Sequence, residues 1–114
     1  MKFDLEDRFI AFTGNTMNYA ETLQRTFAND YLAKQIIRSS GSATLNFAEM
    51  QGTGTDKDYI NKGNIAFKEL KETELNLKVM RFRNIGGDER DILLAESIEL
   101  IKILRTLINK RKGK

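Results

Sequence analysis

The chain has 114 residues, of which 40% are hydrophobic and 31% charged, a balance typical of one globular domain and not of a disordered chain. It contains no histidine and no cysteine, which excludes Ser-His and Cys-His catalytic sites, disulfides and the commonest metal ligands. The net charge is +3, yet four cations lie in the last five residues, so the remainder is close to neutral. We therefore expect a single domain over residues 1–114 that is not an enzyme and binds no cofactor or metal.

The first two expected helices are predicted by apolar residues that recur every three or four positions. The first helix, residues 4–25, places Leu5, Phe9 and Phe12 on one face and begins after Asp4, a residue suited to an N-cap. The second, residues 30–51, follows a break at residues 25–30 that ends in the alternative caps Asn29 and Asp30.

The third and fourth expected helices each follow a turn that contains glycine. Residues 56–84 come after the turn at residues 52–55, where Thr55 and Asp58 resemble a capping box. Residues 88–111 come after the diglycine at positions 86 and 87, and Asp88 with Asp91 repeats the pattern. The chain contains no proline, and its connections are short. These features predict an all-α fold, an antiparallel up-down four-helix bundle.

The fourth expected helix is apolar over more than half of its circumference, whereas one bundle core needs a stripe only a little over 100° wide. We expect the surplus to form a homo-oligomer interface, for which the candidate residues are Leu94, Ile98, Ile101 and Ile108. The alternative is that this helix lies centrally inside the monomer.

The second expected helix carries a polar stripe at 4-4-3 spacing, which comprises Arg38, Ser42, Asn46 and Glu49. One interpretation is a groove for a ligand or a protein partner. The alternative is packing, in which small side chains let helices approach closely and the polar groups bond to backbone or to neighbouring helices.

Basic residues supply the candidate nucleic-acid site. They lie on the third helix, on a stripe of the fourth and in the C-terminal tail, and comprise Lys78, Arg81, Arg83, Lys102, Arg105, Lys110, Arg111 and Lys112. Such stripes predict salt-sensitive binding of the RNA or DNA backbone without sequence preference. The alternative is a solvated face whose cations pair with nearby acidic residues.

The segment from Gln35 to Glu49 resembles a known family signature, which runs Gln-Ile-x-Arg, a small-residue stretch, then Asn-Ile-Ala-Glu-Gly. The family comprises bacterial four-helix-bundle proteins encoded in intervening sequences of large-subunit ribosomal RNA genes. Residues 67–74 are similar to its third helix. Thr44 stands where the family usually has proline and Met50 where it has glycine, which should straighten the second helix and move the turn to Gly52.

The resemblance implies a bundle that assembles as a homopentameric barrel. Family members often carry a ribosomal label, and a related group, the accessory proteins of diversity-generating retroelements, is thought to bind nucleic acid and a reverse transcriptase. No stretch approaches the roughly 18 apolar residues that a membrane-spanning helix needs. We therefore expect a cytoplasmic homo-oligomer, a pentamer by the resemblance, that binds RNA or DNA weakly. The alternative is a protein–protein adaptor without nucleic-acid affinity.

Overall fold

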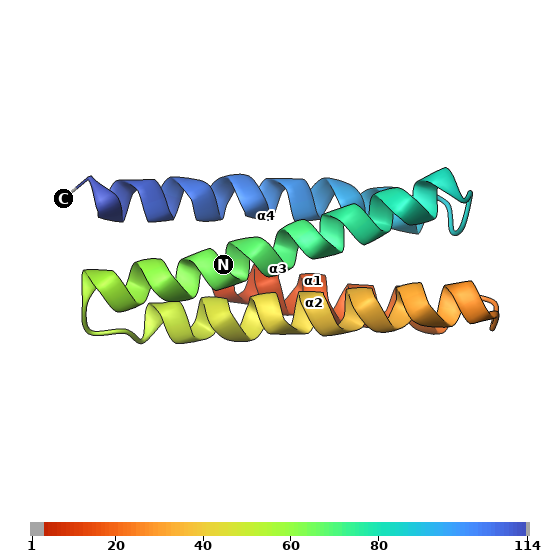
Figure 1. Cartoon of the computed structure of the whole chain (residues 1–114), viewed down its shortest axis with the longest axis horizontal. Coiled ribbons are helices and arrows are strands. Elements are labelled where there is room, and N and C mark those ends of the chain that lie inside the picture. The colour runs from red at the N-terminus through yellow and green to blue at the C-terminus, as the bar shows by residue number, and fades with distance from the viewer. Residues whose placement is uncertain (1–3, 114) are drawn as a thin grey trace.

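The protein folds into four α-helices in a computed structural model that describes residues 4–113 (Figure 1). They are α1 (Leu5–Glu21), α2 (Phe27–Gln51), α3 (Asp56–Phe82) and α4 (Asp88–Lys112). No β-strand occurs within residues 4–113, so the prediction of an all-α four-helix fold is confirmed.

Side-chain caps begin three of the four helices. The carboxylate of Asp4 accepts a hydrogen bond from the Asp7 amide, as expected, and the Thr55 hydroxyl accepts one from the Asp58 amide. Helix α2 starts at Phe27, three residues earlier than expected, because Thr26 and not Asn29 or Asp30 is its cap. The expected cap at Asp88 is also wrong, since Gly87 occupies the N-cap position of α4 and no side chain caps it. Local capping chemistry therefore accounts for three of the helix starts but not for the fourth.

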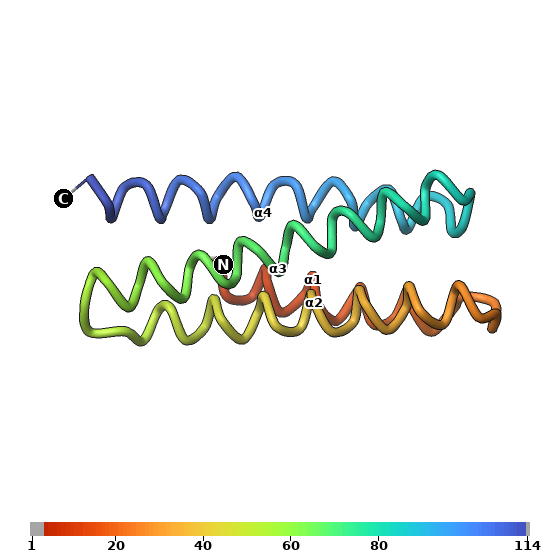
Figure 2. Tube along the Cα trace, viewed as in Figure 1, coloured from red at the N-terminus to blue at the C-terminus, as the bar shows by residue number. Residues whose placement is uncertain are grey.

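The helices follow one another around the bundle, with α1 against α2, α2 against α3 and α3 against α4, and α4 makes fewer contacts with α1. Glu49 pairs with Lys62, whereas Arg38, earlier in α2, pairs with Glu69, later in α3, so α2 and α3 run in opposite directions. Helix α1 has 17 residues against 25 to 27 in the others, and in Figure 2 its trace begins partway along the bundle. The molecule is consequently elongated and flat, with extents of 47 × 31 × 18 Å.

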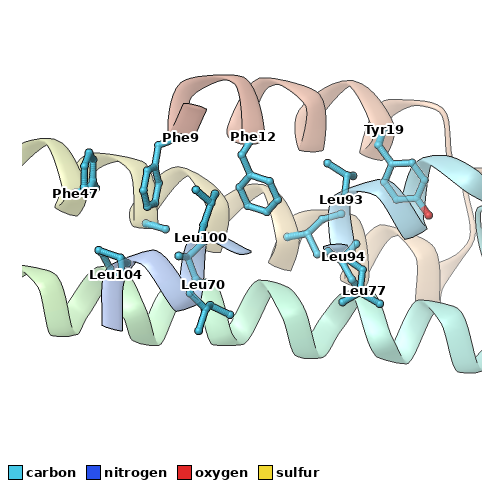
Figure 3. Close-up of a cluster of buried hydrophobic side chains, with 14 of the residues drawn as sticks. Phe9, Phe12, Tyr19, Phe47, Leu70, Leu77, Leu93, Leu94, Leu100 and Leu104 are labelled. Carbon is cyan, nitrogen blue, oxygen red and sulfur yellow. The ribbon is translucent and has the colours of Figure 1, made fainter. Parts of the chain in front are cut away.

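The core is a column of apolar side chains between the helices (Figure 3). Phe9 and Phe47 stack within it with ring centroids 4.3 Å apart, and Leu70, Leu100 and Leu104 of α3 and α4 lie below them in the view of Figure 3. Buried hydroxyl groups are also hydrogen-bonded. The Oγ atom of Ser39 in α2 lies 2.6 Å from Oγ1 of Thr73 in α3. No buried side-chain polar atom among the described residues lacks a partner, so the small hydroxyl residues of α2 serve close helix packing.

Helix α4 does not present the apolar surface predicted from its sequence. Leu94, Ile101 and Ile108 are buried inside the single chain and Ile98 is half-buried, so the proposed interface at these residues is wrong for the three buried ones. For Ile108 the physical reason is Gly63, at which an added Cβ would lie 2.9 Å from Cγ1 of Ile108. The absence of a side chain lets α4 sink against α3, and a closer approach buries a wider arc of the helix.

Candidate nucleic-acid interface

The eight predicted basic residues do not form one site. Lys78, Arg81 and Arg83 lie at or near the C-terminal end of α3, whereas residues 110–112 end α4 at the opposite end of the bundle (Figure 1). Arg81 and Arg83 are exposed and form no ion pair within residues 4–113. The predicted residues therefore lie in separate groups at the two ends of the bundle.

A continuous basic groove does run between α3 and α4. Two adjacent hollows of about 200 and 110 Å³ share Arg105 as a wall, and together they form what we call the α3/α4 groove. Its cations come from both helices, with two asparagine side chains at one end. Its lining includes Asn64, Phe67, Lys71, Glu74, Lys102, Arg105, Asn109 and Lys112.

Glu74 is the acidic residue of the groove lining, and it is neutralised within α3. Its two carboxylate oxygens pair with Nζ of Lys71 at 3.1 Å and Nζ of Lys78 at 2.9 Å. Burial opposes ionisation of Glu74, but the hydrogen bonds and charges of the two lysines outweigh it, so the pKa of Glu74 is lowered. The carboxylate stays charged at neutral pH and holds both lysines at the edge of the groove.

The cations that α4 contributes are held only loosely. Lys102 lies 3.6 Å from Glu99 in an exposed pair, and such pairs contribute little to stability. The guanidinium of Arg105 lies over the Phe67 ring, 5.1 Å from its centroid, so the ring supports one face of the group. Lys112 is exposed at the end of the groove. These groups keep donors free for a phosphate.

Arg111 and Lys110 belong to other environments. The Cζ atom of Arg111 lies 3.5 Å from the centroid of the Tyr59 ring, and its Nη1 donates a hydrogen bond to Oδ1 of Asp56 at 3.3 Å. These contacts hold the end of α4 against the start of α3. Its role is therefore structural, in contrast to the prediction that grouped it with the binding residues. Lys110 is exposed and does not line the groove.

The polar stripe of α2 is bonded within the molecule. Arg38 donates to Glu69 at 3.1 Å and also to Glu72, and Glu49 accepts from Lys62 at 2.5 Å. The Asn46 amide donates to the Ser42 carbonyl at 2.9 Å. These contacts favour the packing interpretation over a ligand groove, because each side chain already has a partner on α3 or on its own helix.

Sequence reasoning found the two basic stripes but missed Phe67 and Glu74, which complete the groove. A signal for Glu74 was present, since it stands three residues after Lys71 and four before Lys78, the spacings at which helical side chains meet. Nothing in the sequence indicated that Phe67 would lie beneath Arg105, because that contact joins two helices.

Comparison with known proteins identifies the family. The profile of the 23S rRNA-intervening sequence proteins matches residues 3–106. The chain belongs to this family. A crystal structure of a protein with unknown function from the S23 ribosomal protein family of Bacteroides thetaiotaomicron VPI-5482 is 30% identical in sequence, with a TM-score of 0.81, and the match covers 92% of this chain and 98% of that one.

A search of curated proteins gave no match. Within residues 4–113, no helix of this intervening-sequence family member is long and apolar enough to cross a membrane. Family membership agrees with the resemblance seen at residues 35–49 and 67–74, and it carries no assigned biochemical activity.

Proposed function

We propose that this protein is a non-enzymatic, cytoplasmic homo-oligomer that binds the phosphate backbone of RNA or DNA weakly through the α3/α4 groove. The observation that carries the proposal is the row of cations from Lys71 and Lys78 through Lys102 and Arg105 to Lys112. The carboxylates of Glu74 and Glu99 offset only part of its charge. Assembly would repeat this row around a symmetry axis and raise the local potential.

The chemistry of the groove suits phosphate better than base edges. Its donors are ammonium, guanidinium and amide groups, which bind phosphate oxygens. The Phe67 ring lines the groove, but the guanidinium of Arg105 covers one of its faces. This contact disfavours stacking of a nucleobase on the ring. If about three cations contact phosphates, log K should fall with log salt with a slope of about −3 on duplex DNA.

A catalytic role has little support in the chain. It contains no histidine or cysteine, and Glu74, the buried acid of the groove, is held ionised by two lysines. A carboxylate whose pKa is lowered in this way is a poor general base at neutral pH.

The test is a titration of labelled single-stranded RNA and duplex DNA, followed by fluorescence anisotropy at low and moderate salt. We expect Lys102→Glu with Arg105→Glu to weaken binding at least tenfold, because two contacts become repulsive. Glu74→Gln should strengthen binding, since it frees Lys71 and Lys78. Lys34→Glu, an exposed lysine on α2 outside the groove, is the matched control. Absence of binding at low salt, or equal losses in the control and the groove variant, would remove this function.

The second candidate is the protein–protein adaptor. It is favoured by Phe27 and Phe82, which are 95% and 91% exposed on α2 and α3. An anisotropy titration without binding, together with an intact assembly, would leave this candidate as the better explanation.

A further inference from the structure

Exposed apolar side chains gather on the outer surface shared by α2 and α3. Leu75, Val79 and Phe82 follow one another on α3 at spacings of four and three, and Phe27 and Tyr31 lie one turn apart on α2. Arg38 continues the α2 row at the same helical spacing, Glu72 continues the α3 row, and the two are hydrogen-bonded to each other. The two rows therefore run side by side, and we call the five apolar residues the aromatic face.

The aromatic face is as large as the largest apolar patches of monomeric proteins, about 300–600 Å², and patches of that size are often functional. Phe and Tyr side chains each offer about 150–250 Å², so five residues exposed to this degree present roughly 600 Å² of apolar area. Monomeric proteins seldom leave more than a few hundred Å² of contiguous apolar surface in water. A stable protein interface buries about 800 Å² on each partner, and the aromatic face supplies most of that.

The opposite side of the bundle is hollowed. The backbone neighbours of α1 are α2 and α4, and those of α3 are also α2 and α4, so the α1/α4 side faces away from the α2/α3 side. Between α1 and α4 lies a depression of about 640 Å³, the α1/α4 hollow. Phe12 and Leu93 form its buried apolar floor, exposed Ala11 and Ala95 leave it open, and Ile92 is exposed at its edge.

The two sides carry opposite charge. Phe82 is flanked by Arg81 and Arg83, neither of which has an ionic partner within residues 4–113. On α4, acidic residues at positions 89, 96 and 99 share a row with Ile92 at 3-4-3 spacing, and Asp7 stands one turn before Ala11 on α1. Arg8 pairs with Glu96 and Lys102 pairs with Glu99, and the remaining acids, Asp7 and Glu89, leave the border of the hollow negative.

The aromatic face and the hollow lie at the same height along the bundle. Phe67 of α3 lies against Arg105 of α4, and Glu74 lines the same small hollow as Ile98, so residues 75–82 of α3 lie level with residues 91–97 of α4. A second copy placed beside the first can thus bring one side against the other without a shift along the axis.

We infer that copies of this chain associate head to tail, with the aromatic face of one copy seated in the α1/α4 hollow of the next. The inference rests on the proposed self-association and names the two surfaces that meet, together with the pairing of Arg81 and Arg83 with the acidic border. Such a contact joins two different surfaces and repeats from copy to copy, so it builds a ring if the rotation between copies closes and an open filament if it does not. Neither surface includes Lys102, Arg105 or Lys112, so the α4 side of the proposed phosphate site stays accessible.

The experiment uses two variants of the full chain and a control. Phe27→Glu with Phe82→Glu places charge on the aromatic face, and Ala11→Arg with Ala95→Arg fills the hollow. All four positions are exposed, so each variant should keep the helical circular dichroism of the wild type. Ile10→Glu, at an exposed apolar residue outside both surfaces, is the control. Masses are measured by light scattering at equal chain concentration.

We expect the wild type and Ile10→Glu to have the mass of an assembly, and each double variant alone to fall to the mass of one chain. An equimolar mixture of the two double variants should form a complex of two chains, because one hollow and one aromatic face remain intact between them. A mixture that stays monomeric, or a hollow variant that assembles like the wild type, overturns the head-to-tail contact and leaves self-association standing. A monomeric wild type overturns the proposed assembly, and this contact with it.

Discussion

Helix α4 meets its two neighbours in opposite ways. Against α3 it lies so close that a Cβ at Gly63 would come within 2.9 Å of Ile108. Against α1 it stands apart, with a depression of about 640 Å³ between them, and Arg8 reaches Glu96 across it with a nitrogen–oxygen distance of 2.7 Å. A residue without a side chain allows close contact on one flank, and long charged side chains bridge the gap on the other.

The two flanks should therefore contribute differently to stability and to association. Close apolar contact gains from dispersion and from the exclusion of water, both of which are lost when the fit is disturbed. A half-exposed ion pair over a depression contributes far less. We expect substitutions on the α3 flank to change the free energy of unfolding strongly, and substitutions on the α1 flank to change it weakly.

The largest effect should come from Ile108→Lys on the close flank. Ile108 is 4% exposed, and a lysine there would bury a charge against Gly63 and Met50 or force the helices apart. We expect a loss of about 3 kcal/mol in the free energy of unfolding, measured by urea titration with circular dichroism.

Thr106→Lys provides the control, because it adds the same charge to an exposed site of α4 and should change stability by about 0.5 kcal/mol or less. If Ile108→Lys remained as stable as the wild type and only lost its assembly, the residue would belong to an interface and the close flank would be misassigned.

A smaller effect is expected from Gly63→Ala. The added methyl would collide with Ile108 and the Met50 sulfur, so we expect a loss of about 1–3 kcal/mol. The same substitution at Gly41 of α2 meets no atom within 4 Å and should stabilise the protein by about 0.5–1 kcal/mol, because alanine loses less backbone entropy in a helix. Both variants are compared by urea titration. If both changed the free energy of unfolding in the same direction, Gly63 would not be what limits the approach of α4 to α3.

Glu74, which lies on α3 between α3 and α4, should make the stability of the protein depend on pH. Its pKa is lowered in the folded protein, so its stabilisation is fully present above the ordinary carboxyl pKa and is lost as pH falls through the folded value. Glu74→Gln should therefore destabilise the protein at neutral pH, by about 1 kcal/mol for two helical ion pairs, and leave it unchanged near pH 2. Urea titrations at both pH values measure this difference, and a variant that is equally destabilised at both would assign Glu74 to packing and not to charge.

Sequence patterns predicted the helices well wherever the controlling interaction was local. The glycine turn after Gln51 was correctly placed at Gly52, and the Asp4 and Thr55 caps were correct because each bonds only three residues ahead. The start of α2 was predicted wrongly, because Thr26 is the N-cap and the sequence had suggested Asn29 or Asp30. Helical periodicity alone could not show that Ile108 of α4 is buried, because its close packing depends on Gly63, a residue 45 positions away.

The same division holds for the candidate site. Basic stripes on α3 and α4 were visible from residue spacing, whereas the groove arises only where the two helices pack together, as Phe67 under Arg105 shows. The exposed Phe27 and Phe82 were not recognised as a surface for the same reason, since they stand 55 positions apart and belong to different helices. Both features require tertiary contacts that no single helix encodes.

The weakest effect is expected on the open flank, from Glu96→Gln. Both partners of the pair are about one-third exposed, at 33% for Arg8 and 28% for Glu96, so solvent screening reduces its contribution to about 1 kcal/mol or less. Asp30→Asn, which breaks the more exposed pair with Arg25, should cause no measurable change in the same urea titration. A loss for Glu96→Gln as large as that for Gly63→Ala would mean that the ion pair, and not the glycine contact, fixes α4 in the bundle. The Arg8–Glu96 pair would then be a main support of the fold at the α1/α4 hollow, and a second copy could not displace it without loss of stability.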